Sequence, residues 1–280
     1  MSAASTTRIL GVDFTSAPSR RKPITIAVAQ FRTSRLIIER VDRAVDFSAF
    51  ELMLATKGPW IGGFDFPFGL PRDVVTACGW PESWPELIGH IQCIGKDAFK
   101  RALDDLRQSR PYGSRYIGRR GDVAAGSSSP MKLVNPPVGL MFFEGTPRLL
   151  RAGLSIAPCS PSGDTRVAFE AYPGYLARKI TTKSYKKDGK DGLSPQRISV
   201  REQLVTALTS AAEVVSGIQV DLPSSLRAVC IADGSGDTLD AVMCAIQAAQ
   251  HVAASGQHGE RGIPKCADPL EGWIITVPDS

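Results

Sequence analysis

The sequence predicts an α/β fold in which helices cover a mixed central sheet in three layers, and the sheet begins with an antiparallel meander of three strands. Short apolar runs rich in β-branched residues come first, and helical and strand-like patterns alternate later in the chain. The chain has 280 residues, of which 43% are hydrophobic and 22% charged, so it can bury a full core. We expect one domain over residues 1–280, with residues 72–166 as an insertion or lid within it.

The predicted meander consists of strands at residues 8–13 (RILGVD), 24–31 (ITIAVAQF) and 36–41 (LIIERV). A polar turn that ends at Pro23 separates the first two strands, and a second short turn separates the next two. Because short turns join neighbouring antiparallel strands, these strands are expected to pair in chain order.

A helix is expected next, at residues 46–56, because Phe47, Phe50 and Leu54 have helical spacing and Asp46 or Ser48 can cap its N-terminus. The remaining predicted elements are strands at residues 60–64, 166–172, 226–232 and 273–277, and helices at residues 98–107, 195–216 and 237–254.

Acidic residues recur where predicted strands end. Asp13 follows ILGV, Asp65 follows WIGGF and Glu170 follows RVAF. Asp237 and Asp240 are three residues apart in the first turn of a predicted helix, so they lie on nearly the same face. The carboxyl ends of strands in an open sheet meet at one crevice, and a helix N-terminus packed there adds its acids to them. Because clustered carboxylates repel one another, a divalent cation or a shared proton must neutralise them, and hard oxygen ligands suit Mg²⁺ or Mn²⁺.

Each acid also has a structural alternative. Asp237 is a natural N-cap, Asp240 suits the helix dipole, and Asp65 can cap the turn that follows it. Asp13 and Glu170 lie in apolar strands, where an uncompensated charge is expensive, so both need partners.

Several short motifs occur in the order found in a known family. They are residues 11–17 (GVDFTSA), 63–67 (GFDFP), 169–173 (FEAYP), 237–245 (DTLDAVMCA) and 271–274 (EGWI). With these motifs the chain resembles domain-of-unknown-function family 429, a family of predicted nucleases with a ribonuclease-H-like fold. The resemblance covers most of the chain, with residues 72–167 largely outside it.

Holliday-junction resolvases are similar at the GVD that ends in Asp13 and at the DxxDA that contains Asp240. The resemblance implies metal-dependent phosphodiester hydrolysis, with Asp13 as a bridging ligand and Asp240 closing the site. Those enzymes often have a glutamate where this chain has Asp65, and Glu170 lies on a later strand, so either residue completes the site. The expected catalytic residues are thus Asp13, Asp65, Glu170, Asp237 and Asp240, with Mg²⁺ or Mn²⁺ held by Asp13, Glu170 and Asp240.

Basic residues outnumber acidic ones, 33 to 28, with aromatic residues near two of the basic clusters. Such residues can contact the phosphates and stack on the bases of DNA or RNA. The candidate nucleic-acid contacts are Arg115, Arg119, Arg120, Lys183, Lys186 and Lys187. The alternative is that residues 181–192 are a solvated loop.

Two other functions fit the sequence. One is an ATP-dependent phosphotransferase of actin-like fold, in which residues 13–16 and 233–236 bind phosphate from opposite sides of a nucleotide-sized cleft. The other is a non-catalytic binding protein in which the acids only cap turns and helices. The sequence has no run of about 18 apolar residues and no apolar secretory signal, so a cytoplasmic protein that does not enter a membrane is expected.

Overall fold

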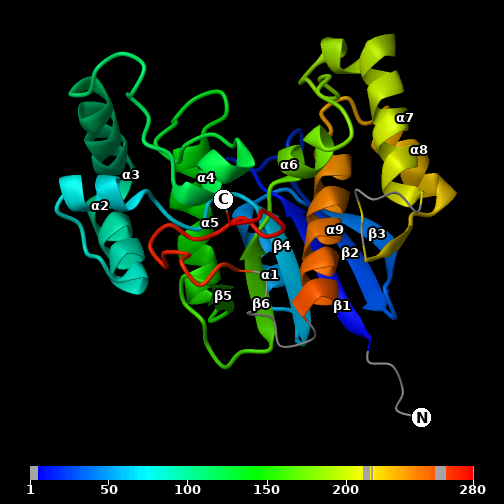
Figure 1. The fold of residues 1–280 in the computed structure, drawn as a ribbon, viewed down its shortest axis with the longest axis horizontal. Helices are drawn as coiled ribbons and strands as arrows, with labels where there is room; N and C mark the ends of the chain where they lie inside the picture. The colour runs from blue at the N-terminus through cyan, green and yellow to red at the C-terminus, as the bar shows by residue number, and fades with distance from the viewer. Residues whose placement is uncertain (1–5, 211–214, 216, 256–262, 280) are drawn as a thin grey trace.

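The computed structural model describes residues 6–210, 215, 217–255 and 263–279, and its centre is a mixed sheet of seven strands with helices on both sides (Figure 1). The strand order is β5-β6-β4-β1-β2-β3-β7. The strands are β1 (Thr7–Asp13), β2 (Ile24–Arg32), β3 (Arg35–Ala44), β4 (Trp60–Asp65), β5 (Ser155–Ala157), β6 (Arg166–Glu170) and β7 (Gln219–Asp221).

The expected meander is confirmed, because β1 pairs antiparallel with β2 and β2 antiparallel with β3. On the other side of β1 the pairing changes direction. Strands β4, β6 and β5 run parallel to β1 and to one another, so the carboxyl ends of β1, β4 and β6 share one edge of the sheet. β7 pairs parallel with β3 at the far end.

The helices are α1 (Phe47–Leu54), α2 (Arg72–Ala77), α3 (Trp84–Gln108), α4 (Arg120–Ala125), α5 (Val138–Arg151), α6 (Pro173–Arg178), α7 (Pro195–Thr209), α8 (Ser224–Ala232) and α9 (Asp237–Ser255), with a 3₁₀ turn at Lys190–Leu193. The first helix is where the sequence predicts it, and the Asp46 carboxylate accepts a 2.8 Å hydrogen bond from the backbone N–H of Ala49. No helix among the described residues is long and apolar enough to span a bilayer.

The sheet separates two hydrophobic cores. Val12 and Phe64 face one core, where α1, α3 and α5 pack, and Ile9 faces the other core, which α7 and α9 cover. Residues 72–166 contribute much of the first core and also add β5 to the sheet. That this segment is an insertion stays a prediction.

Two strand predictions are wrong. Residues 226–232 belong to helix α8, in which Cys230 is buried whereas Val229 is 42% exposed. A short apolar run does not distinguish a buried strand from a helix that buries one side. Residues 273–277 make only one bridge to β6, between Ile274 and Glu170, and the chain then folds back so that the Trp273 indole donates to the Val277 carbonyl. Part of the helix predicted at residues 195–216 lies outside the described residues; α7 itself ends at Thr209.

Candidate metal centre and the adjoining pocket

Asp13 and Asp65 lie side by side at the carboxyl ends of neighbouring strands. They are the last residues of β1 and β4, and the parallel register pairs them directly. Residues paired across parallel strands project from the same face, so both carboxylates point toward the face that α9 covers. The local sequence, an apolar strand that ends in an acid, places each side chain at the strand end, and the register of the strands places both on the same face.

Two glycines allow α9 to lie directly on these strands. A Cβ atom on Gly11 would be 2.0 Å from the Ala241 carbonyl oxygen, and one on Gly63 would be 2.6 Å from that of Cys244. Side chains are thus excluded at both positions, and the helix backbone contacts the strand backbone. This close contact brings Asp240, in the first turn of α9, to the carboxylates of Asp13 and Asp65.

The three carboxylates form a cluster that could hold a metal ion. One oxygen from each of Asp13, Asp65 and Asp240 lies within 4.8 Å of the other two. Opposite ligands in an octahedral Mg²⁺ site are about 4 Å apart, because each bond is about 2.1 Å long. The spacing and the all-oxygen donor set therefore fit Mg²⁺ or Mn²⁺ after small movements of the side chains.

In this acid cluster of Asp13, Asp65 and Asp240, the first two have no hydrogen-bond donor within the described structure. No residue in the described part of the chain donates a hydrogen bond to the side chain of Asp13 or Asp65. Burial, followed by repulsion from Asp240, raises the pKa of Asp13 well above its ordinary value. Burial also raises the pKa of Asp65 to about 7, although Lys186 opposes the shift. Both carboxylates are thus acceptors that a nearby cation would stabilise.

Asp240 has two partners on the loop after α6. It is fully buried, the Tyr185 hydroxyl donates a 2.5 Å hydrogen bond to one of its oxygens, and the Lys186 ammonium forms an ion pair with the other. Buried Arg201 holds this loop by donating to the carbonyl oxygens of Tyr185 and Gly192 at 2.7 and 2.9 Å. One ammonium group faces three carboxylates, so it cannot balance all three when they are ionised.

These contacts change the expected role of Lys186 and give Tyr185 and Arg201 roles that the sequence did not indicate. Lys186 was expected to contact nucleic acid, whereas the structure directs its ammonium group into the acid cluster. Tyr185 and Arg201 hold the loop and Asp240, but they have no local motif that marks them.

Glu170 does not join the acid cluster, contrary to the expected ligand set. Its register partner on β4 is Phe64, one residue before Asp65, so its side chain projects from the opposite face of the sheet. There it forms an ion pair with Arg119 at 2.6 Å and accepts a hydrogen bond from the Phe68 backbone N–H at 2.9 Å. These donors satisfy the buried carboxylate, which explains how it is tolerated at a strand end.

Arg119 is likewise unavailable to a phosphate backbone. It is 2% exposed and donates to the carboxylates of Asp122 and Glu170 and to the carbonyl oxygen of Glu271. All of its guanidinium nitrogens are used in these contacts. The structure therefore corrects its predicted role, from a nucleic-acid contact to a buried counter-ion.

Asp237 begins α9, but it is not in the acid cluster. Burial raises its pKa, and Lys22 opposes the shift. The residue that caps the helix is Asp233, whose carboxylate accepts hydrogen bonds from the backbone N–H and the hydroxyl of Thr238 at 2.9 and 2.7 Å. The sequence placed the cap at Asp237, four residues too late.

Three of the other basic candidates each have a partner of their own. Arg115 lies over the Tyr112 ring at 5.2 Å, Arg120 is 3.6 Å from Asp279 and Lys187 is 2.6 Å from Asp191. Lys183 is exposed and lines a pocket next to the acid cluster.

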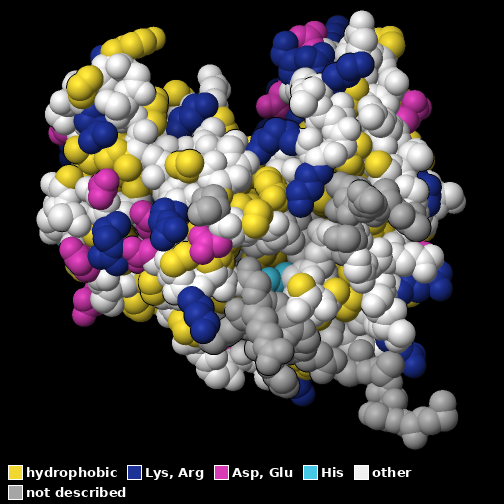
Figure 2. All heavy atoms as spheres, in the orientation of Figure 1, with side chains coloured by type: hydrophobic (Ala, Val, Ile, Leu, Met, Phe, Trp, Pro, Cys, Tyr) yellow, Lys and Arg dark blue, Asp and Glu magenta, His cyan; other side chains and the backbone are white. Residues whose placement is uncertain are grey.

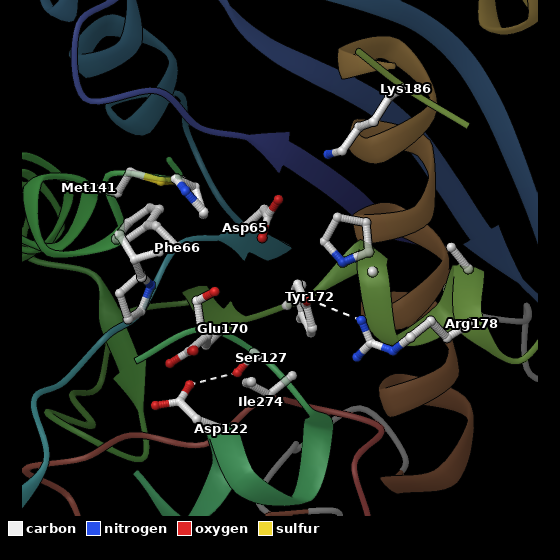
Figure 3. Close-up of a pocket in the computed structure, with 18 of the residues that line it drawn as sticks. Asp65, Phe66, Asp122, Ser127, Met141, Glu170, Tyr172, Arg178, Lys186 and Ile274 are labelled. Atoms are coloured by element: carbon white, nitrogen blue, oxygen red, sulfur yellow. Dashed lines mark hydrogen bonds between the residues drawn. The ribbon is translucent and has the colours of Figure 1, made fainter. Parts of the chain in front are cut away.

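That pocket has a volume of about 480 Å³ (Figure 3). Asp65 and Lys186 lie at one end, and Arg119, Asp122 and Glu170 form part of the wall. In Figure 2 the molecule is hollowed between the part that contains α3 and α4 and the part that contains α7 and α8, with Lys and Arg side chains along the edges.

The loop at residues 233–236 does not line this pocket. The Gly234 carbonyl oxygen accepts a hydrogen bond from the Lys187 N–H at 3.1 Å, and the Lys186 side chain covers Gly236. An actin-like phosphotransferase, in which this loop would face Asp13 across a cleft, gains no support from this pocket and stays a prediction.

Comparisons with protein-family models, with curated proteins and with solved structures find no match. The function is therefore inferred from the geometry of the site.

Proposed function

We propose that this protein is a divalent-metal-dependent nuclease of ribonuclease-H-like fold, in which Asp13, Asp65 and Asp240 hold Mg²⁺ or Mn²⁺. The observation that supports it most is the cluster of three carboxylates, in which Asp240 is buried and Asp13 and Asp65 are half-buried and receive no hydrogen bond from any described residue. The meander and the parallel strands beside it agree with the fold that the family resemblance implies.

The proposed ligand set replaces Glu170 by Asp65. Asp13 lies next to Asp65 across the strand pair and is close to Asp240, which suits it to be the central ligand. Tyr185 and Lys186 fix the orientation of Asp240. A bound ion would supply a Lewis acid and a water molecule with a lowered pKa, so the reaction needs no side chain as general base.

Phosphodiesters are the proposed substrates because the site combines hard oxygen ligands with nearby positive charge. Mg²⁺ is usually bound by one or two protein carboxylates together with phosphate oxygens of the substrate. Lys183 lines the pocket beside the acid cluster and would attract a phosphate toward it.

Metal binding is the first test. Titration calorimetry with Mn²⁺ should show binding to the wild type and to Asp42→Asn, which changes an exposed aspartate on β3. Binding should be lost in Asp13→Asn and weakened at least about tenfold in Asp65→Asn, because each variant removes a charged ligand. Absence of Mn²⁺ binding to the wild type would refute the proposal and favour a non-catalytic binding protein.

Cleavage is the second test. Labelled single-stranded DNA, duplex DNA, RNA and a four-way DNA junction are incubated with the protein, with and without Mn²⁺ or Mg²⁺. We expect metal-dependent cleavage of at least one substrate by the wild type and Asp42→Asn, and none by Asp13→Asn. A protein that binds Mn²⁺ at these residues but cleaves none of the four would not be a nuclease of this class.

A further inference from the structure

The pocket beside the acid cluster has two walls of different chemistry. One wall is apolar and consists of Phe66 and Pro67, which follow β4, together with Val138 and Met141 of α5. The opposite wall consists of α6 and residues 181–186, with three cationic side chains and several hydroxyl groups. Such a pocket suits a ligand that has a flat apolar part and an anionic part.

Of these three, Lys186 forms an ion pair with Asp240, and the other two are Arg178 and Lys183. Within the described residues, neither lies within 4 Å of a carboxylate oxygen. Arg178 donates hydrogen bonds to the Tyr172 hydroxyl at 3.1 Å and to the Ala125 carbonyl oxygen, both of which are uncharged. Its guanidinium is therefore held in place, and its positive charge is not neutralised by a neighbour (Figure 3).

Two of the three carboxylates that line the pocket, Asp122 and Glu170, in contrast, already have a partner. Arg119 forms ion pairs with Asp122 and Glu170. Lys186 lies near Asp65, and its positive charge lowers the pKa of that carboxyl, against the effect of burial. An anionic ligand is thus attracted to the side of α6 and residues 181–186.

The volume limits what can enter. About 480 Å³ lies within the range of small-molecule sites, roughly 300 to 1,000 Å³, and a paired, stacked base cannot be accommodated there. A single unpaired nucleotide can enter, with its base against Phe66 and Met141.

We propose that this pocket binds one nucleoside monophosphate unit, with its phosphate near Arg178 and Lys183, and that a single strand presents it as its terminal nucleotide. The assignment to a strand end rests on the proposed nuclease function, because Asp65 belongs both to the pocket and to the acid cluster. The next phosphodiester along the strand then lies toward Asp65.

Binding of adenosine 5′-monophosphate, measured by calorimetry in EDTA, tests the pocket without metal. We expect the wild type to bind it and to bind adenosine at least about tenfold more weakly, because adenosine lacks the phosphate. Arg178→Gln and Lys183→Gln should each weaken binding about tenfold, and Met141→Trp, which fills the apolar wall, should abolish it. Arg120→Gln is the matched control, since Arg120 is exposed and does not line the pocket.

A competition experiment distinguishes a free nucleotide from the terminal nucleotide of a strand as the ligand. A linear single-stranded oligonucleotide with a terminal phosphate should displace the mononucleotide, and a circular strand of the same sequence should not. If the mononucleotide binds and the linear strand fails to displace it, the strand-end assignment is overturned and the ligand is a free nucleotide.

Other outcomes separate this proposal from the nuclease proposal. Absence of mononucleotide binding, or binding unchanged in Arg178→Gln, Lys183→Gln and Met141→Trp, would overturn the pocket assignment even if the protein cleaves nucleic acid. Mononucleotide binding that depends on these residues, in a protein that neither binds Mn²⁺ nor cleaves, would support the pocket and refute the nuclease proposal. Mn²⁺ binding by Met141→Trp would show that this variant is folded.

Discussion

Replacing Glu170 by glutamine distinguishes a buried counter-ion from a metal ligand. Arg119 donates two hydrogen bonds to Glu170, at 2.6 and 2.7 Å, and each residue is 2% exposed. In Glu170→Gln the shape is kept, the charge is lost, and the new amide NH₂ faces a guanidinium that also donates. Asp122 remains as the only carboxylate within 4 Å of Arg119 among the described residues.

The expected loss of stability follows from this geometry. Removing one partner of a buried ion pair costs about 3 to 5 kcal/mol. Because Asp122 still neutralises Arg119 and the glutamine carbonyl still accepts one bond, we expect a loss of about 3 kcal/mol. For a chain of this length that corresponds to a fall in Tm of roughly 6 to 12 °C. Glu82→Gln, which alters an exposed ion pair with Arg72, should change stability by less than about 1 kcal/mol.

The assay combines urea denaturation, followed by circular dichroism, with Mn²⁺ calorimetry on the same variants. Glu170→Gln should be less stable than Glu82→Gln and should bind Mn²⁺ within about threefold of the wild type, since Glu170 projects from the other face of the sheet. If Glu170→Gln were as stable as the wild type and did not bind Mn²⁺, the reasoning would be refuted and Glu170 would return to the ligand set.

Three further predictions concern the acid cluster and its support. Lys186→Met leaves fully buried Asp240 without its ammonium partner. Because the Lys186 side chain is 43% exposed, solvent screens the pair, and we expect the metal-free variant to lose about 2 kcal/mol of unfolding free energy, measured by urea denaturation. Unchanged stability would show that the pair contributes little. Asp65 has a pKa of about 7 in the folded state, above its unfolded value, so the stability it contributes is complete below about pH 4 and is lost as the pH rises through about 7. In EDTA, Asp65→Asn should therefore be more stable than the wild type by about 2 kcal/mol at about pH 8 and equal to it at about pH 4; equal stability at both pH values would contradict the burial of this carboxylate. Gly11→Val puts a side chain into the backbone of α9 and should lower the free energy of unfolding by about 3 kcal/mol or more, with a matching fall in Tm. Gly163→Val is the control and should have little effect on Tm, because a Cβ there meets nothing within 4 Å. Similar Tm values for the two variants would refute the close packing.

Some of the candidate site follows from the sequence because it depends on local patterns. Asp13 and Asp65 each end an apolar strand, and their position at one sheet edge follows once the strands are parallel. Asp240 is indicated by its place in the first turn of a long apolar helix. The meander is likewise marked by short turns between β-branched runs.

The rest depends on register and on contacts between distant segments. Glu170 has the same local pattern as Asp65, but a shift of one residue in the pairing of β4 with β6 turns it to the other face. Arg119 and Lys186 each lie in a basic stretch of sequence, and only the tertiary structure shows that both face carboxylates. The helix at Ser224–Ala232 was missed because a seven-residue apolar run fits either period.

The contact of α9 with Gly11 has a consequence for how the protein is made. Asp13 and Asp65 are synthesised early and are adjacent as soon as β1 and β4 pair, whereas Asp240 comes from a helix near the end of the chain. Contacts between such distant segments form slowly because a long loop must close first. The acid cluster is therefore complete only after nearly the whole chain has left the ribosome, and a nascent chain that stops before Asp237 lacks the third carboxylate of the cluster.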